Sequence, residues 1–95
     1  MTVMRFTPNA SPTIGVEIEL QLIDAKELAL CSCIDQLLSA LPAHLQESVK
    51  PELMQCYVEI NTRICRTVRE AGDDLRSKLA ELESIIHPMG IRLLW

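Results

Sequence analysis

The stretch Thr13-Ile-Gly-Val-Glu-Ile-Glu-Leu-Gln-Leu-Ile23 alternates apolar and polar residues over most of its length. Side chains of a β-strand point to opposite faces in turn, so this alternation predicts a strand with one apolar and one polar face. The polar face carries Glu17 and Glu19, which lie roughly 6 to 7 Å apart at the usual rise of a strand. Carboxylates at this spacing repel each other unless a cation or water screens them. The pattern therefore indicates either a metal-binding face or a face that is open to solvent.

The middle of the chain predicts a short helix and a second strand. Apolar residues at helical spacing favour a helix over 32–41, which Pro42 ends because proline lacks an N–H and clashes with the preceding turn. Residues 42–53 are polar and predict irregular structure with at most one helical turn. Alternation returns at Met54–Thr62, where Glu59 falls on the polar face.

The C-terminal third predicts a long helix followed by a strand. Thr67-Val-Arg-Glu70 has the spacing of a capping box, and apolar residues then recur every three or four positions up to Pro88-Met89-Gly90. Ile91–Trp95 is apolar and predicts a last strand. At the other end, the prolines and polar residues of 1–12 favour an irregular, extended lead-in. Residues 24–30 predict a turn, with Leu28–Leu30 as a candidate short strand.

Composition limits the chain to one domain and excludes several classes of partner. Its 95 residues carry 9 basic and 13 acidic side chains, and a net charge of -4 argues against nucleic acid or an anionic membrane as the ligand. No segment reaches the roughly 20 apolar residues that span a bilayer, and residues 1–12 contain no signal-peptide run. We therefore expect a cytoplasmic protein.

The cysteines predict buried, reduced thiols. Cys31, Cys33, Cys56 and Cys65 lie among apolar or helix-forming neighbours and include no pair at the spacing that zinc sites use.

Three blocks of this sequence resemble the opening region of the family-2 glutamate-cysteine ligases, also called carboxylate-amine ligases. They are Pro12-Thr-Ile-Gly-Val-Glu-Ile-Glu-Leu-Gln-Leu-Ile-Asp24, Lys50-Pro-Glu-Leu-Met-Gln-Cys-Tyr-Val-Glu-Ile-Asn-Thr62 and Ile64-Cys-Arg-Thr-Val68. Their order and spacing agree with the family, and the likeness extends over 12–94. Three matching blocks are more specific than one acidic strand.

The resemblance implies an α+β fold, an antiparallel sheet with helices packed on one face, as part of a glutamine-synthetase-like domain. It also implies an ATP-dependent ligase with Mg²⁺ as its cofactor. Members activate the side-chain carboxylate of glutamate as an acyl phosphate, which an amine such as that of cysteine then displaces. Phosphoryl transfer depends mainly on positioning and on neutralising charge, and Mg²⁺ prefers carboxylate oxygens as ligands.

The same resemblance assigns the acidic residues to the metal. Glu17 and Glu19 match the paired acids of the family's first strand, Glu59 matches the acid of its second block, and Glu52 matches a further acid upstream. All four are expected to hold Mg²⁺, and Glu17, Glu19 and Glu59 are also expected to lie beside ATP. In a regular strand the odd separation of Glu52 and Glu59 would place them on opposite faces, so we expect a bulge or bend near Pro51 to Met54.

Two more residues match the polar end of the second block and the start of the third. The resemblance implies that Thr62 lies beside the cofactor. It also implies that Arg66 is a catalytic residue that contacts a phosphate or a substrate carboxylate through its bidentate guanidinium. A structural ion pair or a helix-start position is the alternative interpretation of Arg66.

Members of the family are several times longer than this chain, so the sequence predicts one truncated domain, the N-terminal part of a ligase catalytic domain over 13–95. Two or three strands and two helices cannot enclose a cleft that holds ATP and two substrates, so we do not expect turnover by this chain alone. The rival hypothesis is an inactive interaction module. Its strand edges at Thr13–Ile23 and Ile91–Trp95 would pair with a second chain, including another copy of this one.

Overall fold

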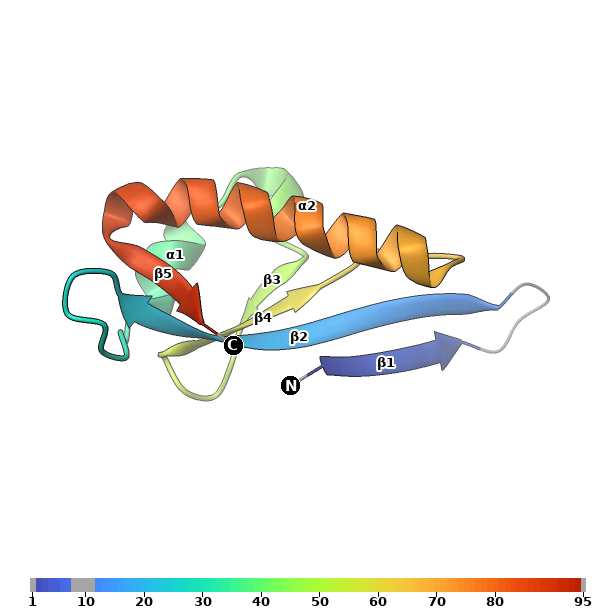
Figure 1. Cartoon of the computed structure of the whole chain (residues 1–95), viewed down its shortest axis with the longest axis horizontal. Helices are drawn as coiled ribbons and strands as arrows, with labels where there is room; N and C mark the ends of the chain where they lie inside the picture. The colour runs from blue at the N-terminus through green and yellow to red at the C-terminus, as the bar shows by residue number, and fades with distance from the viewer. Residues whose placement is uncertain (1, 8–11, 95) are drawn as a thin grey trace.

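The computed structural model of the chain describes residues 2–7 and 12–94. They form a five-stranded antiparallel sheet with both α-helices on the same side of it (Figure 1). The predicted fold class, α+β with helices packed on one face of an antiparallel sheet, is confirmed, whereas the likeness to glutamine synthetase stays a prediction. In chain order the elements are β1 (Thr2–Thr7), β2 (Thr13–Asp24), α1 (Ile34–Ser39), η1 (Ala43–Leu45), β3 (Val49–Pro51), β4 (Tyr57–Asn61), α2 (Val68–Ile86), η2 (His87–Met89) and β5 (Ile91–Leu94), where η denotes a 3₁₀ helix.

The long strand β2 is the centre of the sheet, and its bounds extend one residue beyond the predicted 13–23. Gln21 pairs with Tyr57 of β4 and with Leu94 of β5, so β4 and β5 lie on opposite edges of β2. β1 pairs with residues 13–18 and therefore shares an edge with β5, while β3 adds to the outer edge of β4. Both edges of β2 are thus paired, so the expectation that Thr13–Ile23 offers an exposed edge to a second chain was wrong.

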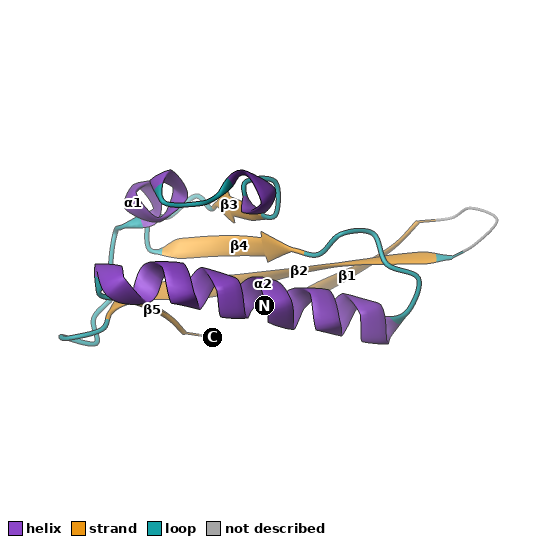
Figure 2. Ribbon diagram, turned by 90° about the horizontal axis from the view of Figure 1, so that it is seen from above, coloured by secondary structure: helices purple, strands orange, loops and turns teal. Residues whose placement is uncertain are grey.

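The apolar face of the sheet packs against α2, which runs along β2 and β4 (Figure 2). Leu22, Ile60, Leu82 and Ile86 have no exposed surface, and burying each such side chain contributes roughly 1.5–3 kcal/mol. The opposite face of β2 and β4 has no helix of the described part of the chain against it, and its side chains are half-buried. In residues 2–7 and 12–94 no helix combines the length and apolarity that crossing a membrane requires.

The segment before β4 differs from the expected irregular stretch. The predicted helical turn is present as η1, but residues 49–51 form β3, which the sequence did not predict, and the strand expected from Met54 begins at Tyr57. Pro51 lacks an N–H and is tolerated here because β3 is an edge strand. The chain then turns back through residues 52–56, where Leu53 is 99% exposed. The bend expected near Pro51 to Met54 is therefore confirmed.

Two expectations near the ends of β2 were wrong. The irregular lead-in predicted for 1–12 is a strand over residues 2–7, because the edge of β2 offers backbone groups that need partners; residues 1 and 8–11 lie outside the described part. The candidate strand Leu28–Leu30 is only a single bridge between Leu30 and Ile23.

The prediction of four reduced cysteines was wrong for Cys31 and Cys33, which form a disulfide. The chain bends between the Leu30 bridge and α1, which brings the two α-carbons to 5.3 Å, within the range that a disulfide spans. Cys56 and Cys65 are free and buried, as predicted.

The predicted capping box starts α2. Thr67 is the N-cap, and its Oγ1 accepts a hydrogen bond of 3.1 Å from the backbone N–H of Glu70. The carboxylate of Glu70 accepts from the backbone N–H of Arg66 at 2.9 Å, one residue earlier than in the usual box. At the other end, Gly90 has φ +76, a left-handed conformation that glycine adopts without strain, and it turns the chain into β5.

An ion pair on α2 holds the end of β4. Lys78 Nζ donates to Asp74 Oδ2 at 2.8 Å and to the backbone O of Asn61 at 3.1 Å, and both charged side chains are 14% exposed. Asp74 Oδ2 also accepts from the backbone N–H of Arg63 at 2.9 Å. Burial opposes ionisation of Asp74, but the hydrogen bonds from Lys78 and Arg63 and their charges outweigh it and lower its pKa. The end of β4 is thereby fixed to α2.

Replacing Thr67 with alanine should lower the free energy of unfolding by about 1 kcal/mol, because the N–H of Glu70 loses its acceptor. Urea denaturation followed by circular dichroism measures the change, and Thr67→Ser, which keeps the hydroxyl, is the control. Equal stability of the alanine and serine variants would contradict the capping role.

Replacing Asp74 with asparagine should destabilise the chain by roughly 1–3 kcal/mol at pH 7, because Lys78 loses its partly buried partner. A lowered pKa means that the stabilisation is complete above the unfolded value of about 4 and disappears as pH falls through the folded value. The difference between wild type and variant should therefore shrink below about pH 4. Asp73→Asn, at an exposed ion pair with Arg76, is the control and should change stability by less than about 1 kcal/mol.

Candidate functional site

The uncovered face of the sheet pairs polar residues of β2 with polar residues of β4. Backbone hydrogen bonds run from Thr62 N to Val16 O at 2.9 Å and from Leu22 N to Cys56 O at 2.8 Å. These bonds make Val16–Thr62 and Leu22–Cys56 hydrogen-bonded pairs. In an antiparallel ladder, hydrogen-bonded and non-hydrogen-bonded pairs alternate. The pairs whose side chains face the open side are therefore non-hydrogen-bonded, with α-carbons about 4.5 Å apart. These rows are Glu17 opposite Asn61, Glu19 opposite Glu59, and Gln21 opposite Tyr57.

Glu19 and Glu59 therefore face each other at the closest approach that a sheet allows. Like charges directly opposite are destabilising, by roughly 0.2–1 kcal/mol. On the other side of Glu59, its partner in β3 is Lys50, whose side chain is exposed. The sequence predicted the two acids but missed Lys50, because β3 was not expected.

Glu52 joins this pair from the turn between β3 and β4. Burial and the charges of Glu19 and Glu59 raise the pKa of Glu52, and a hydrogen bond with Glu19 acts in the same direction. A hollow of about 320 Å³ beside the acids is lined by Glu19, Glu52, Leu53, Met54 and Tyr57. The turn thus overcomes the odd separation of Glu52 and Glu59 and brings Glu52 to a place where the charges of Glu19 and Glu59 act on it.

The neighbouring row consists of Glu17 and Asn61. Glu17 is two residues from Glu19 on the same face, and Asn61 Nδ2 donates to Glu59 Oε2 at 3.4 Å. Asn61 Oδ1 is buried and has no hydrogen-bond partner in the described part of the chain. Sequence reasoning did not select Asn61, although it occupies the second position after Glu59 and so shares its face.

Thr62 and Arg66 lie away from the Glu19–Glu59 row. Thr62 Oγ1 accepts from Val16 N at 3.0 Å, so this hydroxyl fastens β4 to β2. Arg66 follows Cys65, which forms an isolated bridge with Ile14 of β2. Ile14 lies five residues before Glu19 on this strand, a distance of roughly 16 Å along the backbone. The backbone N–H of Arg66 donates to Glu70, which fits the helix-start interpretation. A catalytic role for Arg66 stays a prediction.

The donor set of this face is all oxygen: the carboxylates of Glu17, Glu19, Glu52 and Glu59, with the amide of Asn61 beside them. Such donors suit Mg²⁺ or Ca²⁺ and not the softer metals. Within residues 2–7 and 12–94, no three side chains of His, Cys, Asp or Glu are arranged closely enough to hold a metal ion. The donor types suit Mg²⁺, but this structure, in its described part, does not group three of the acids at a metal-binding distance, and their role as ligands stays a prediction.

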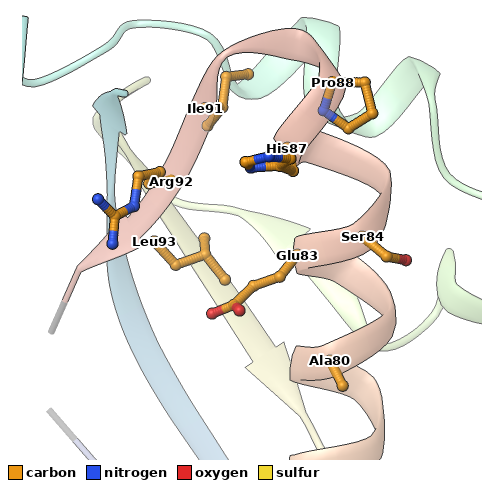
Figure 3. A pocket seen from close by; sticks show the side chains of 8 residues that line it. All are labelled: Ala80, Glu83, Ser84, His87, Pro88, Ile91, Arg92 and Leu93. Atoms are coloured by element: carbon orange, nitrogen blue, oxygen red, sulfur yellow. The ribbon is translucent and has the colours of Figure 1, made fainter. Parts of the chain in front are cut away.

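A second hollow, of about 590 Å³, lies between the end of α2 and β5 (Figure 3). Figure 3 shows His87, Glu83 and Arg92 at its wall, a mixture of charges without a common sign. None of the predicted site residues lines it. We therefore place the candidate site on the acidic face of β2 and β4.

The comparisons with known proteins agree on one family. The family model described as glutamate-cysteine ligase family 2 matches residues 13–95. The relative named "Putative glutamate--cysteine ligase 2" from Gloeobacter violaceus is 37% identical over 91 residues, which cover 94% of this chain and 24% of the relative. A relative of the same name from Herpetosiphon aurantiacus is 37% identical over 86 residues, which cover 90% of this chain and 22% of the relative.

A third relative, from Rubrobacter xylanophilus, is 46% identical over 68 residues, which cover 72% of this chain and 18% of the relative. The chain thus spans about a quarter or less of the length of these curated relatives. Both the first acidic strand and the block that contains Glu59 fall within the match to the family model. This chain belongs to glutamate-cysteine ligase family 2.

Proposed function

We propose that this chain supplies the acidic wall of an ATP-dependent carboxylate-amine ligase of the glutamate-cysteine ligase type. The observation that carries the proposal is the Glu19–Glu59 row, in which two carboxylates face each other on a sheet face that no helix of the described part covers. Two such charges at closest approach cost stability unless a cation lies between them. Membership of the family supports a ligase.

In this proposal Glu17, Glu19, Glu52 and Glu59 hold Mg²⁺, which neutralises negative charge on the phosphates of ATP. The side-chain carboxylate of substrate glutamate would attack the γ-phosphate of ATP, which releases ADP and forms an acyl phosphate. An amine such as that of cysteine would then displace inorganic phosphate and lose a proton to form the amide. The carboxylates orient the phosphates and are not consumed. Because ATP is a substrate, we propose the cytoplasm as the compartment.

Lys50 has a defined place in this arrangement. Its position opposite Glu59 puts an exposed ammonium at the rim of the acidic row, where it can pair with a phosphate or a substrate carboxylate. The remaining walls of the cleft would come from the parts that the longer relatives possess beyond the region that matches this chain.

Replacing Glu59 with glutamine should have opposite effects with and without Mg²⁺. Without the ion, the variant should be more stable than wild type by about 0.2–1 kcal/mol, because the repulsion by Glu19 is relieved. With Mg²⁺ in the millimolar range, wild type should gain thermal stability and the variant should gain little, because it has lost a ligand. Thermal unfolding at a series of Mg²⁺ concentrations measures both effects.

Glu47→Gln is the matched control, because it removes one negative charge at an exposed position away from the acidic row. It should keep the stabilisation by Mg²⁺. A wild-type chain that gains no stability from Mg²⁺, or equal gains in wild type and Glu59→Gln, would rule out the cation role of the row.

A second candidate function is an interaction module that pairs through its strand edges. In the described part of the chain, the outer edges of β1, β3 and β5 have no partner strand. Ile64 and Val68 are 73% and 64% exposed, which adds apolar surface beyond the end of β4. An exposed strand edge can pair with a second chain, and exposed apolar side chains elsewhere on the surface can add to such a contact.

Sedimentation equilibrium at micromolar concentration tests this second candidate. If the edges pair, the chain should sediment as a dimer or larger species, and Ile64→Asp should shift it toward the monomer by placing a charge in the contact. Glu47→Gln serves again as the variant that should not change the association. A wild-type monomer over the whole concentration range would exclude the interaction module as a self-associating unit.

A further inference from the structure

The outer edge of β5 offers backbone groups that no strand of the described part takes up. Ala25 N donates to Gly90 O at 2.8 Å, which makes these two residues a hydrogen-bonded pair on the edge that faces β2. Hydrogen-bonded and non-hydrogen-bonded pairs alternate in an antiparallel ladder, so Arg92 directs its N–H and C=O to β2. Ile91 and Leu93 therefore direct theirs to the outer edge, where no strand within residues 2–7 and 12–94 pairs with them.

The hollow of about 590 Å³ lies on the helix side of this edge (Figure 3). One face of α2 forms one wall and β5 forms the other, and Figure 3 shows Leu93 pointing across the hollow toward Glu83. Its volume is in the range of sites that hold ligands. Residues opposite each other in a ladder share a face, so a strand added beside β5 would extend every second side chain into this space.

Arg92 lies on the other face of β5. It is opposite Ile23 in the register, and Figure 3 shows its side chain extending away from α2. It is exposed and forms no ion pair within the described ranges. A strand on the outer edge would place one residue directly opposite Arg92 in a non-hydrogen-bonded pair, the closest approach in a sheet. Opposite charges stabilise such a pair, so an acidic residue is favoured at that position.

A second copy of β5 does not meet this requirement. With Ile91 opposite Leu93 of the second copy, Arg92 would face Arg92 of that copy, and like charges directly opposite destabilise the pair. Glu83 fixes the register of the strand that does fit. A slip of one residue would turn the acidic residue of that strand from Arg92 to the side of Glu83, where it is repelled. The edge thus favours a strand with an acidic residue between apolar ones.

We propose that the outer edge of β5 receives an extended segment of this pattern, and that the segment belongs to the part of the ligase that the longer relatives possess beyond the matched region. The proposal rests on the proposed function, because it treats this chain as one part of a larger ligase. This chain covers about a quarter or less of the curated relatives, so most of their sequence is available to supply the segment. The backbone of the segment bonds to Ile91 and Leu93, its acidic residue pairs with Arg92, and its apolar residues fill the hollow.

Overlapping synthetic peptides that cover the unmatched part of the Gloeobacter violaceus relative test the proposal against the isotope-labelled 95-residue chain. Amide hydrogen exchange followed by NMR is the readout. A peptide with the stated pattern should slow exchange at Ile91 and Leu93 by about tenfold or more, because their N–H groups gain acceptors. Arg92, whose N–H already faces β2, is the internal control and should change less.

Arg92→Glu should weaken the binding of that peptide by about tenfold, because an attractive pair becomes a repulsive one. Replacing the acidic residue of the peptide with lysine should restore binding to this variant. Arg69→Glu is the matched control, since it makes the same charge reversal at an exposed position at the other end of α2. It should bind the original peptide as wild type does.

Absence of binding by every peptide, binding without protection of Ile91 and Leu93, or equal binding by wild type and Arg92→Glu would overturn the proposal. Protection of these two amides in the chain alone, rising with its concentration, would assign the edge to a second copy and overturn it as well. The proposed cation role is tested through Glu59→Gln on the other face of the sheet, so its outcome is independent of this edge.

Discussion

The pairing of β2 along both of its edges is the constraint on which the rest of the structure depends. β4 covers one edge, and β1 and β5 cover successive parts of the other. With its edges satisfied, β2 presents its apolar side to α2 and carries Glu17 and Glu19 on the opposite side, in an alternation that ends at Ile23. A slip of one residue in the register would exchange these faces and bury the acids.

The register also creates the electrostatic tension of the candidate site. It places Glu19 opposite Glu59 and Glu17 opposite Asn61 in the rows where side chains approach most closely. The raised pKa of Glu52 is a sign of the same crowding, since burial and the charges of Glu19 and Glu59 both favour its protonated form. The cation proposed for this face would relieve that crowding.

The helix layer contributes to the site although it packs against the opposite face. Lys78 donates to the backbone O of Asn61, and Asp74 accepts from the backbone N–H of Arg63. Thr62 fastens the same segment to β2 through Val16. The end of β4 is therefore fixed from two directions, which keeps the side chains of its open face in a constant geometry.

The sequence alone determined β2, the capped helix α2 and the identity of the acids, because alternation, capping and carboxylate chemistry are local properties that neighbouring residues carry. It could not determine β1, β3 or the end-to-end placement of β1 and β5, since an edge strand depends on a partner that is distant in the chain. For the same reason Lys50 and Asn61 were missed. Arg66, for which the family resemblance implies contact with a phosphate or a substrate carboxylate, follows the bridge between Cys65 and Ile14, away from the Glu19–Glu59 row. Tertiary pairing decides which polar residues meet, because register brings together positions that no spacing in the sequence relates.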